Sequence, residues 1–185
     1  NVLCADMERM VRRMIHQNAT IISEPGENLP GVRGDKTQLR QILLNLITNA
    51  SDAIRQKGMR GTIRIRTSRS FCSAEMLSSS LASDQSAPGE YVILEVIDNG
   101  VGMSPAVLDK LFTPFFTTKE NGHGLGLAAM LGSIRSHQGF IVVESTEQVG
   151  TTFRLGLPVS QGDPSETGHI VRRAPAKKEL GEVLV

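Results

Sequence analysis

Three side chains that carry oxygen donors lie at helical spacing in the segment 35–57. At about 100° per residue, Asn45, Asn49 and Asp52 fall within about 60° of one another, along one border of an apolar face. Asn is unfavourable inside a helix because its side chain competes for backbone hydrogen bonds. These residues therefore either form a solvated stripe or flank a cleft in which phosphate oxygens and a hard cation bind.

A second group follows an apolar strand that ends in Asp98. Two glycines come next at alternate positions, Gly100 and Gly102. Asn99-Gly100 alone is typical of an ordinary turn. The second glycine, however, would let a ligand approach the backbone closely, and the Asp98 carboxylate could accept a hydrogen bond from an exocyclic amine.

The third group is the glycine-rich segment 121–127, which precedes a predicted helix. Glycines at that point leave backbone N–H groups free to face an anion. The spacing matches neither a Walker A loop nor a dinucleotide fingerprint. Just before it, Phe112 and Phe115 are predicted to be core residues, whereas Lys119 could offer a cation to a phosphate.

The elements that must position these groups follow from periodicity. The helix over 35–57 would begin at an Asp35 cap and end at Gly58. Residues 70–90, with seven Ser, are typical of a mobile loop. The order predicts an α+β fold, a two-layer sandwich with helices on one face of a mixed, mostly antiparallel sheet. Strands are predicted at 19–23, 62–67, 91–97, 140–145 and 152–157, and other helical segments at 3–17, 105–111 and 125–136.

The composition favours one folded domain and a tail. Of 185 residues, 39% are hydrophobic and the net charge is +1, which argues against overall disorder and against a basic surface for nucleic acid. Cys4 and Cys72 are too isolated for a disulfide framework or a zinc site and favour a reduced, cytoplasmic setting. No apolar run is long enough to span a membrane. Without an initiator Met or signal-peptide pattern, the chain is predicted to be a piece of a longer protein, with a domain at 1–158 and a linker at 159–185.

The order of these motifs resembles the ATP-binding catalytic domain of sensor histidine kinases. That domain has the Bergerat-type fold of the superfamily that also contains DNA gyrase, the ninety-kilodalton heat-shock chaperone and MutL. The segment 41–50 resembles the family's asparagine box, 98–103 and 122–127 its two glycine boxes, 112–119 its phenylalanine box, and 150–153 its last box.

The resemblance implies a role for each matching residue in binding ATP and Mg²⁺. Asp98 would accept a hydrogen bond from the adenine amine, and Asn49 would be the Mg²⁺ ligand. Asn45 and Lys119 would act on the phosphates as the catalytic pair. The remaining residues implied to contact the nucleotide are Gly100, Gly102, Met103, Gly122, Gly124, Leu125, Gly126 and Thr151.

Two positions separate the branches of this superfamily. Many histidine kinases carry a basic residue where this chain has Asp52, which leaves more of the phosphate contact to Lys119. The ATP-hydrolysing members carry a general-base Glu where this chain has Asn45, which cannot accept a proton at neutral pH. The resemblance therefore implies phosphoryl transfer, with a chaperone-like or topoisomerase-like ATPase and a non-catalytic nucleotide sensor as the alternatives.

The phosphoacceptor histidine is expected on a separate dimerisation domain. His16, His123, His137 and His169 all lack the acidic neighbour that typically follows the phosphorylated residue. The phosphoryl group would pass on to a receiver domain or response regulator. Residues 182–185 resemble the opening strand of such a receiver domain, with a disordered tail as the alternative.

Overall fold

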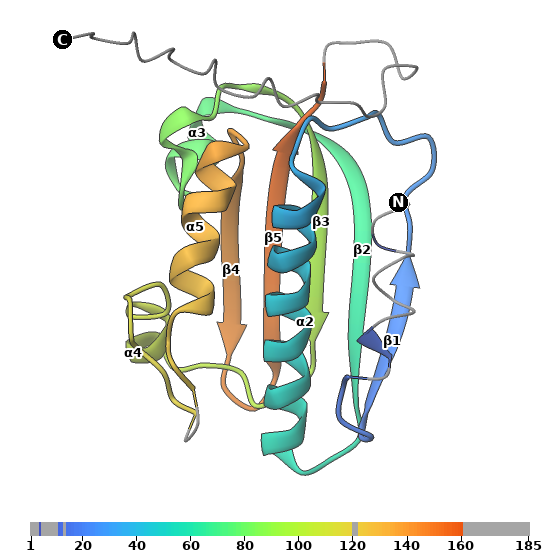
Figure 1. Cartoon of the computed structure of the whole chain (residues 1–185), viewed down its shortest axis with the longest axis vertical. Coiled ribbons are helices and arrows are strands. Elements are labelled where there is room, and N and C mark those ends of the chain that lie inside the picture. The colour runs from blue at the N-terminus through green and yellow to red at the C-terminus, as the bar shows by residue number, and fades with distance from the viewer. Residues whose placement is uncertain (1–3, 5–10, 13, 120–121, 161–185) are drawn as a thin grey trace, which may run out of the picture.

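The computed structural model describes residue 4 and residues 11–12, 14–119 and 122–160, and it shows a five-stranded sheet with helices packed against it (Figure 1). The strand order is β1-β2-β3-β5-β4, with β1 parallel to β2 and every other pair antiparallel. This confirms the α+β class. The strands are β1 (Ala19–Glu24), β2 (Gly61–Cys72), β3 (Gly89–Asp98), β4 (Phe140–Thr146) and β5 (Gly150–Pro158), and the helices are α2 (Lys36–Lys57), α3 (Ala74–Ser78), η1 (Ser83–Gln85), α4 (Pro105–Leu108) and α5 (Gly126–Ser136).

Helix α2 is defined at both ends by the predicted residues. The Asp35 carboxylate accepts hydrogen bonds from the backbone N–H groups of Thr37 and Gln38 at 2.7 and 3.2 Å. Gly58 ends the helix in the left-handed conformation, with φ of 72°, where a glycine avoids the steric penalty of a side chain. These two caps therefore fix the residues at which the helix begins and ends.

One apolar core lies between the sheet and the two long helices. Helices α2 and α5 cover the same face of the sheet (Figure 1). Leu43, Leu46 and Ile47 of α2 are fully buried there, against Ile63 of β2 and Val96 of β3. Because the apolar stripe of α2 faces the sheet, its polar border is directed to one side of the helix.

The segment 70–90 is more ordered than its Ser-rich composition predicts. Strand β2 continues to Cys72, and Ser73 caps α3 by accepting a hydrogen bond from the Met76 N–H at 3.3 Å. Leu77 of α3 is buried in a second apolar cluster, on the face of the sheet opposite α2. Leu81 then pairs with Ile141 on the outer edge of β4. The prediction of a mobile loop is wrong here, because a few apolar residues secure the segment to β4.

The other predicted elements agree with the structure within a few residues. The turn predicted at 105–111 contains the shorter helix α4, and the helix predicted at 3–17 falls mostly on residues outside the described ranges. The tail after residue 160 also lies outside them. No described helix is both long and apolar enough to cross a membrane.

Two glycines provide a matched test of this packing. A side chain on Gly156 of β5 would overlap the ring of Phe140, which packs edge-to-face on Tyr91 with ring centroids 5.2 Å apart. Gly156→Ala is expected to destabilise the fold by about 1–3 kcal/mol through overpacking. Gly132→Ala, on the exposed side of α5 with no described atom within 4 Å of the added carbon, should instead stabilise it by about 0.5–1 kcal/mol. Urea unfolding measures both, and equal effects would contradict the packing.

Candidate functional site

A cavity of about 550 Å³ lies between α2, the ends of β3 and β5, α4 and the segment that leads into α5. It gathers nearly all the site residues predicted from the sequence, although these are spread over more than 100 positions of the chain. Those that line it are Asn45, Asn49, Asp98, Gly102, Met103, Lys119, Gly122, Gly124, Leu125, Gly126 and Thr151.

Gly100 is the predicted residue that does not line the cavity. Its N–H donates a hydrogen bond to Asp98 Oδ1 at 2.8 Å, and a side chain at this position would collide with Ala53 of α2. The glycine therefore lets the loop after β3 lie directly against the helix. Its role in this structure is to hold the Asp98 carboxylate and to permit close packing.

The Asp98 carboxylate is the buried ionisable group of the cavity, with 7% of the residue exposed. Burial disfavours the charged form and raises its pKa from 3.8 to about 6, against the opposing effects of the Gly100 and Thr151 N–H groups and of Lys57. Asp98 pairs with Thr151 across β3 and β5. The carboxylate is thus presented at a strand end, with little water around it.

Ser145 connects the two strands beside Asp98, and the sequence analysis did not identify it. Its hydroxyl lies 2.9 Å from Thr151 Oγ1 and accepts a hydrogen bond from the Met103 N–H at 2.9 Å. It belongs to β4, where its position on the cavity side of the sheet is the one signal that could have indicated it. Ser145 thereby holds the loop after β3 against the end of β5.

Lys57, at the end of α2, is a second residue that sequence reasoning missed. Its ammonium donates hydrogen bonds to the carbonyls of Asn99, Gly100 and Gln148 at 2.9, 3.2 and 2.8 Å. These contacts link the helix to the loop after β3 and to the β4–β5 turn. A cation also suits the C-terminal end of a helix.

Asn45 makes protein contacts at the entrance of the cavity. Its Nδ2 donates to the carbonyl of Gly126 at 3.3 Å, and its Oδ1 accepts from Gln41 at 3.0 Å. It therefore connects α2 to the first turn of α5. Within the described chain, no side chain caps α5, so the N–H groups of its first turn stay available at the cavity.

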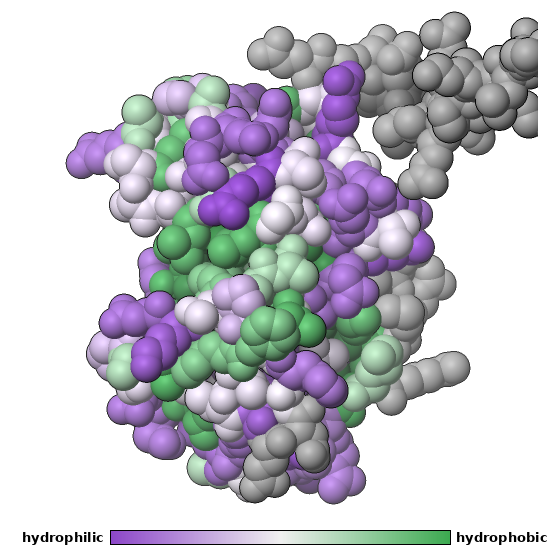
Figure 2. Space-filling view, turned by 60° about the vertical axis from the view of Figure 1, so that its left-hand side comes forward, coloured by the Kyte–Doolittle hydropathy of each residue, from purple (hydrophilic) through white to green (hydrophobic). Residues whose placement is uncertain are grey.

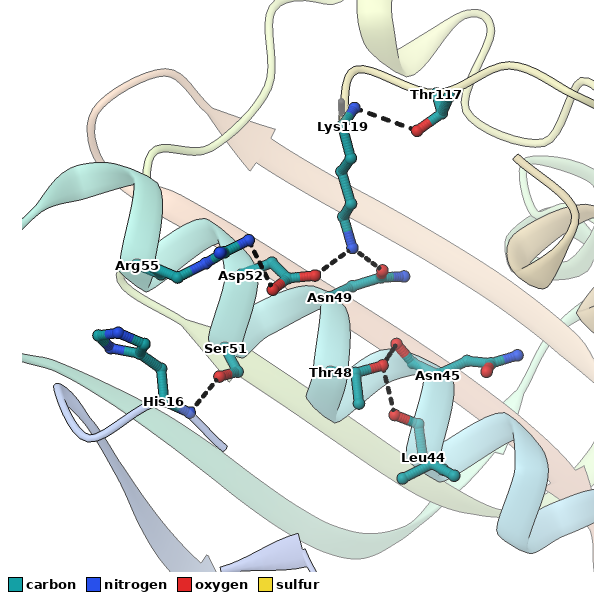
Figure 3. Close-up of polar contacts among 10 residues, drawn as sticks. All are labelled: His16, Leu44, Asn45, Thr48, Asn49, Ser51, Asp52, Arg55, Thr117 and Lys119. Atoms are coloured by element: carbon teal, nitrogen blue, oxygen red, sulfur yellow. Dashed lines mark hydrogen bonds and ion pairs between the residues drawn. The ribbon is translucent and has the colours of Figure 1, made fainter. Parts of the chain in front are cut away.

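Lys119 reaches across the cavity to α2 (Figure 3). Its ammonium donates to Asn49 Oδ1 at 2.7 Å and forms an ion pair with Asp52 Oδ2 at 2.6 Å. About one third of each charged side chain stays exposed, 35% for Lys119 and 34% for Asp52. The sequence could place Asn49 and Asp52 together, because both lie on one helix. The structure adds Lys119 to this pair.

Phe115 differs from its prediction as a core residue. It is 74% exposed and has φ of 66°, and its N–H donates to the carbonyl of Gly124 at 3.0 Å. The ring therefore lies at the surface, beside this backbone contact. Phe112 does pack against the core. The side of the molecule with α4 and α5 shows hydrophobic surface between polar regions (Figure 2).

The groups that line the cavity suit different parts of a ligand. Around Asp98 the walls are largely apolar, with Met103, Leu111 and Phe153 among them, which suits a flat ring that carries an amine donor. The cavity is also lined by Lys119 and by Gly126 at the N-terminus of α5, which together suit an anion. The site can therefore bind a molecule with an aromatic head and an anionic tail.

Residues 34–161 match the family described as "Histidine kinase-, DNA gyrase B-, and HSP90-like ATPase". The sensor kinase CckA of Brucella abortus is 36% identical over 83% of this chain and 16% of its own length. The sensor histidine kinase ZraS of Escherichia coli is 39% identical over 72% and 24%. The sensory histidine kinase/phosphatase NtrB of Rhodobacter capsulatus is 39% identical over 76% and 37%. The chain thus spans well under half the length of each of these relatives.

Two solved structures share the architecture. The catalytic domain of the histidine kinase ThkA superposes with a TM-score of 0.59 at 28% identity and covers 85% of this chain and 88% of that one. Full-length ShkA in complex with AMPPNP gives a TM-score of 0.66 at 24% identity, over 85% of this chain and 29% of that one. The second comparison concerns the fold alone.

The burial of Asp98 predicts an effect on stability that depends on pH. Because its folded-state pKa of about 6 lies above the ordinary 3.8, Asp98 favours folding most below pH 3.8, and this contribution is lost as the pH rises to about 6. Asp98→Asn lacks this titration. Its free energy of unfolding is therefore expected to rise relative to that of wild type as the pH increases from 3.8 to about 6. Above that range the difference should stay at about 3 kcal/mol.

Urea unfolding at pH 4.5 to 7.5, without nucleotide, measures this difference. Asp84→Asn is the matched control, since Asp84 is exposed and pairs with Arg135 away from the cavity. A difference between Asp98→Asn and wild type that does not change with pH would contradict the assignment.

Proposed function

We propose that this chain, which belongs to the family of histidine kinase-, DNA gyrase B- and HSP90-like ATPases, is the catalytic domain of a protein-histidine kinase. In this proposal it binds Mg-ATP and donates the γ-phosphoryl group to a histidine on a separate dimerisation domain, in the cytoplasm. The observation that carries the proposal is one cavity lined by both the buried carboxylate of Asp98 and the ammonium-bearing side chain of Lys119.

The adenine end of ATP fits the apolar part of this cavity. The ionised Asp98 carboxylate would accept a hydrogen bond from the exocyclic amine, and Met103 and Gly102 would lie beside the ring. Gly102 has φ of 65° and passes close to the Thr146 carbonyl, so a side chain there would disturb this wall. Specificity for adenine would follow because a carboxylate cannot donate a hydrogen bond to a carbonyl in the same position.

The phosphates would lie toward Lys119 and the first turn of α5. Asn49 offers an amide oxygen on the same side of α2, and oxygen donors are the ligands that Mg²⁺ takes. When bound, Mg²⁺ would neutralise part of the charge on the β- and γ-phosphates. Lys119 and the backbone N–H groups of the segment before α5 would bind the remaining charge and orient the terminal phosphate.

Transfer is favoured over hydrolysis by the residue at position 45. The amide of Asn45 cannot remove a proton from water, and it is already engaged with Gly126 and Gln41. In the transfer step, a ring nitrogen of the acceptor histidine would form a bond to the γ-phosphorus. The bond from that phosphorus to the bridging oxygen would break, and ADP would leave with the electron pair.

None of the chain's four histidines is followed by an acidic residue, and the contacts of His137 make it poorly suited as an acceptor. His137 is buried, accepts a hydrogen bond from the Asp35 N–H through Nε2 at 2.9 Å, and has Nδ1 within 2.6 Å of the Ser133 carbonyl. His169 lies outside the described residues. We therefore assign the acceptor to a separate dimerisation domain, which would pass the phosphoryl group to an aspartate of a receiver domain or response regulator.

Incubating the chain alone with Mg-ATP should yield no stable phosphohistidine. Acid-labile, base-stable labelling with γ-labelled ATP measures this, and ATP binding by calorimetry on the same sample shows that the protein is active in binding. Labelling that maps to His16, His123, His137 or His169 would overturn the assignment of the acceptor.

Adding a histidine-bearing dimerisation domain in trans should produce labelled phosphohistidine on that domain. Asn49→Ala and Asp98→Asn should each lower the rate at least about 100-fold, because each removes a contact to the metal or to adenine. Asp84→Asn should leave the rate unchanged. Rapid ATP hydrolysis without transfer would favour the ATPase alternative, and binding with neither reaction would favour a nucleotide sensor.

A further inference from the structure

We infer that Asp52 is a second protein group of the Mg²⁺ site, and that the Lys119 ammonium occupies the position of this ion in the empty protein. The inference rests on the proposed function, since it concerns the same nucleotide site. It assigns a role to Asp52, which stands where many histidine kinases carry a basic residue.

The geometry places one cation against two oxygens of α2. Asn49 Oδ1 and Asp52 Oδ2 are 2.7 and 2.6 Å from the same atom, Lys119 Nζ, so both oxygens face one point (Figure 3). Asn49 and Asp52 are three residues apart, which puts them on neighbouring turns of the same helix border. The pair of oxygens is fixed by the helix, whereas the cation between them comes from a different segment of the chain.

The two oxygens are suitable donors for Mg²⁺. Carboxylate and amide oxygens are hard ligands, and Mg²⁺ is commonly held by one or two carboxylates together with nucleotide phosphates and waters. The ammonium and the metal ion cannot both occupy this point, because their charges repel at such short range. Entry of Mg²⁺ with the nucleotide would therefore release Lys119, which becomes available to the phosphates.

A simpler interpretation is that Asp52 only neutralises a neighbouring surface charge. Its other oxygen, Oδ1, does contact Arg55 at 3.3 Å, but that side chain is 58% exposed and lies on the helix surface. Such exposed pairs contribute little. The oxygen that faces the cavity is Oδ2, and it is engaged at the shorter distance by Lys119.

Because Asp52 is negatively charged, it should affect the binding of ATP in opposite directions without and with the metal ion. Without metal, the carboxylate repels the triphosphate and retains Lys119, so it weakens binding of ATP. With metal, the same carboxylate attracts the ion and strengthens binding. A residue that only stabilises the helix would affect both forms of the nucleotide alike.

The affinity of Asp52→Asn for ATP, measured by calorimetry once in EDTA and once in saturating Mg²⁺, tests these opposite effects. The variant should bind metal-free ATP about threefold more tightly and Mg-ATP about tenfold more weakly than wild type, so that the coupling between metal and nucleotide falls about 30-fold. Asp84→Asn should match wild type in both titrations. Equal changes in the two titrations, or none, would overturn the inference.

A double-mutant cycle separates contact with the metal from an effect through Lys119. Mn²⁺ binding to the complex with ADP is followed by electron paramagnetic resonance in wild type, Asp52→Asn, Lys119→Gln and the double variant. If Asp52 faces the ion, Asp52→Asn weakens Mn²⁺ binding in the Lys119→Gln background as well. If the effect disappears there, Asp52 acts only by holding the lysine and the inference is wrong.

Metal-dependent binding of ATP by the wild-type chain distinguishes failure of the proposed function from failure of this inference. Failure of the wild-type chain to bind ATP in a metal-dependent way would count against the proposed function. Metal-dependent binding by wild type that is unchanged in Asp52→Asn would leave the proposed function intact and remove only this inference.

Discussion

The packing of α2 on the sheet is the constraint on which the site depends. Burial of one apolar stripe fixes the rotation of the helix, and the polar border then has to face the cavity. Both helix ends are also tied to distant segments. The Asp35 N–H donates to His137 at the end of α5, and Lys57 binds carbonyls beside Asp98. Helix α2 therefore holds the end of α5 and the loop after β3 in place relative to one another.

Two charged groups of the cavity are held by contacts with the protein itself. A carboxylate is held where burial makes its charge costly, and an ammonium is held by two oxygens of α2. The buried charge of Asp98 reduces the stability of the empty protein near neutral pH, but a hydrogen-bond donor from a ligand would offset that cost. The Asp98 carboxylate, which in the proposed function would recognise adenine, thus lowers the stability of the protein without a ligand.

Local patterns predicted the elements well wherever the periodicity was strong. The α2 boundaries followed from an N-cap and a glycine, and β3 from an apolar run interrupted only by Glu95. The errors came from composition. Serines in the segment 70–90 suggested a loop, although Leu77 and the backbone of Leu81 secure it to the sheet. Phe115 was expected inside because it is aromatic, but it is exposed, in a backbone conformation with positive φ that composition does not indicate.

The sequence by itself determined which chemical groups are available and which of them share an element. Asn45, Asn49 and Asp52 lie on one border because the helical period is local, and Asp98 ends a strand because the apolar run stops there. Only the tertiary structure decided which partners these groups meet. Lys119 contacts residues 70 and 67 positions earlier, and Ser145 joins Met103 to Thr151 across two strands. Such contacts depend on how the helices dock and the sheet closes, and no local period encodes that.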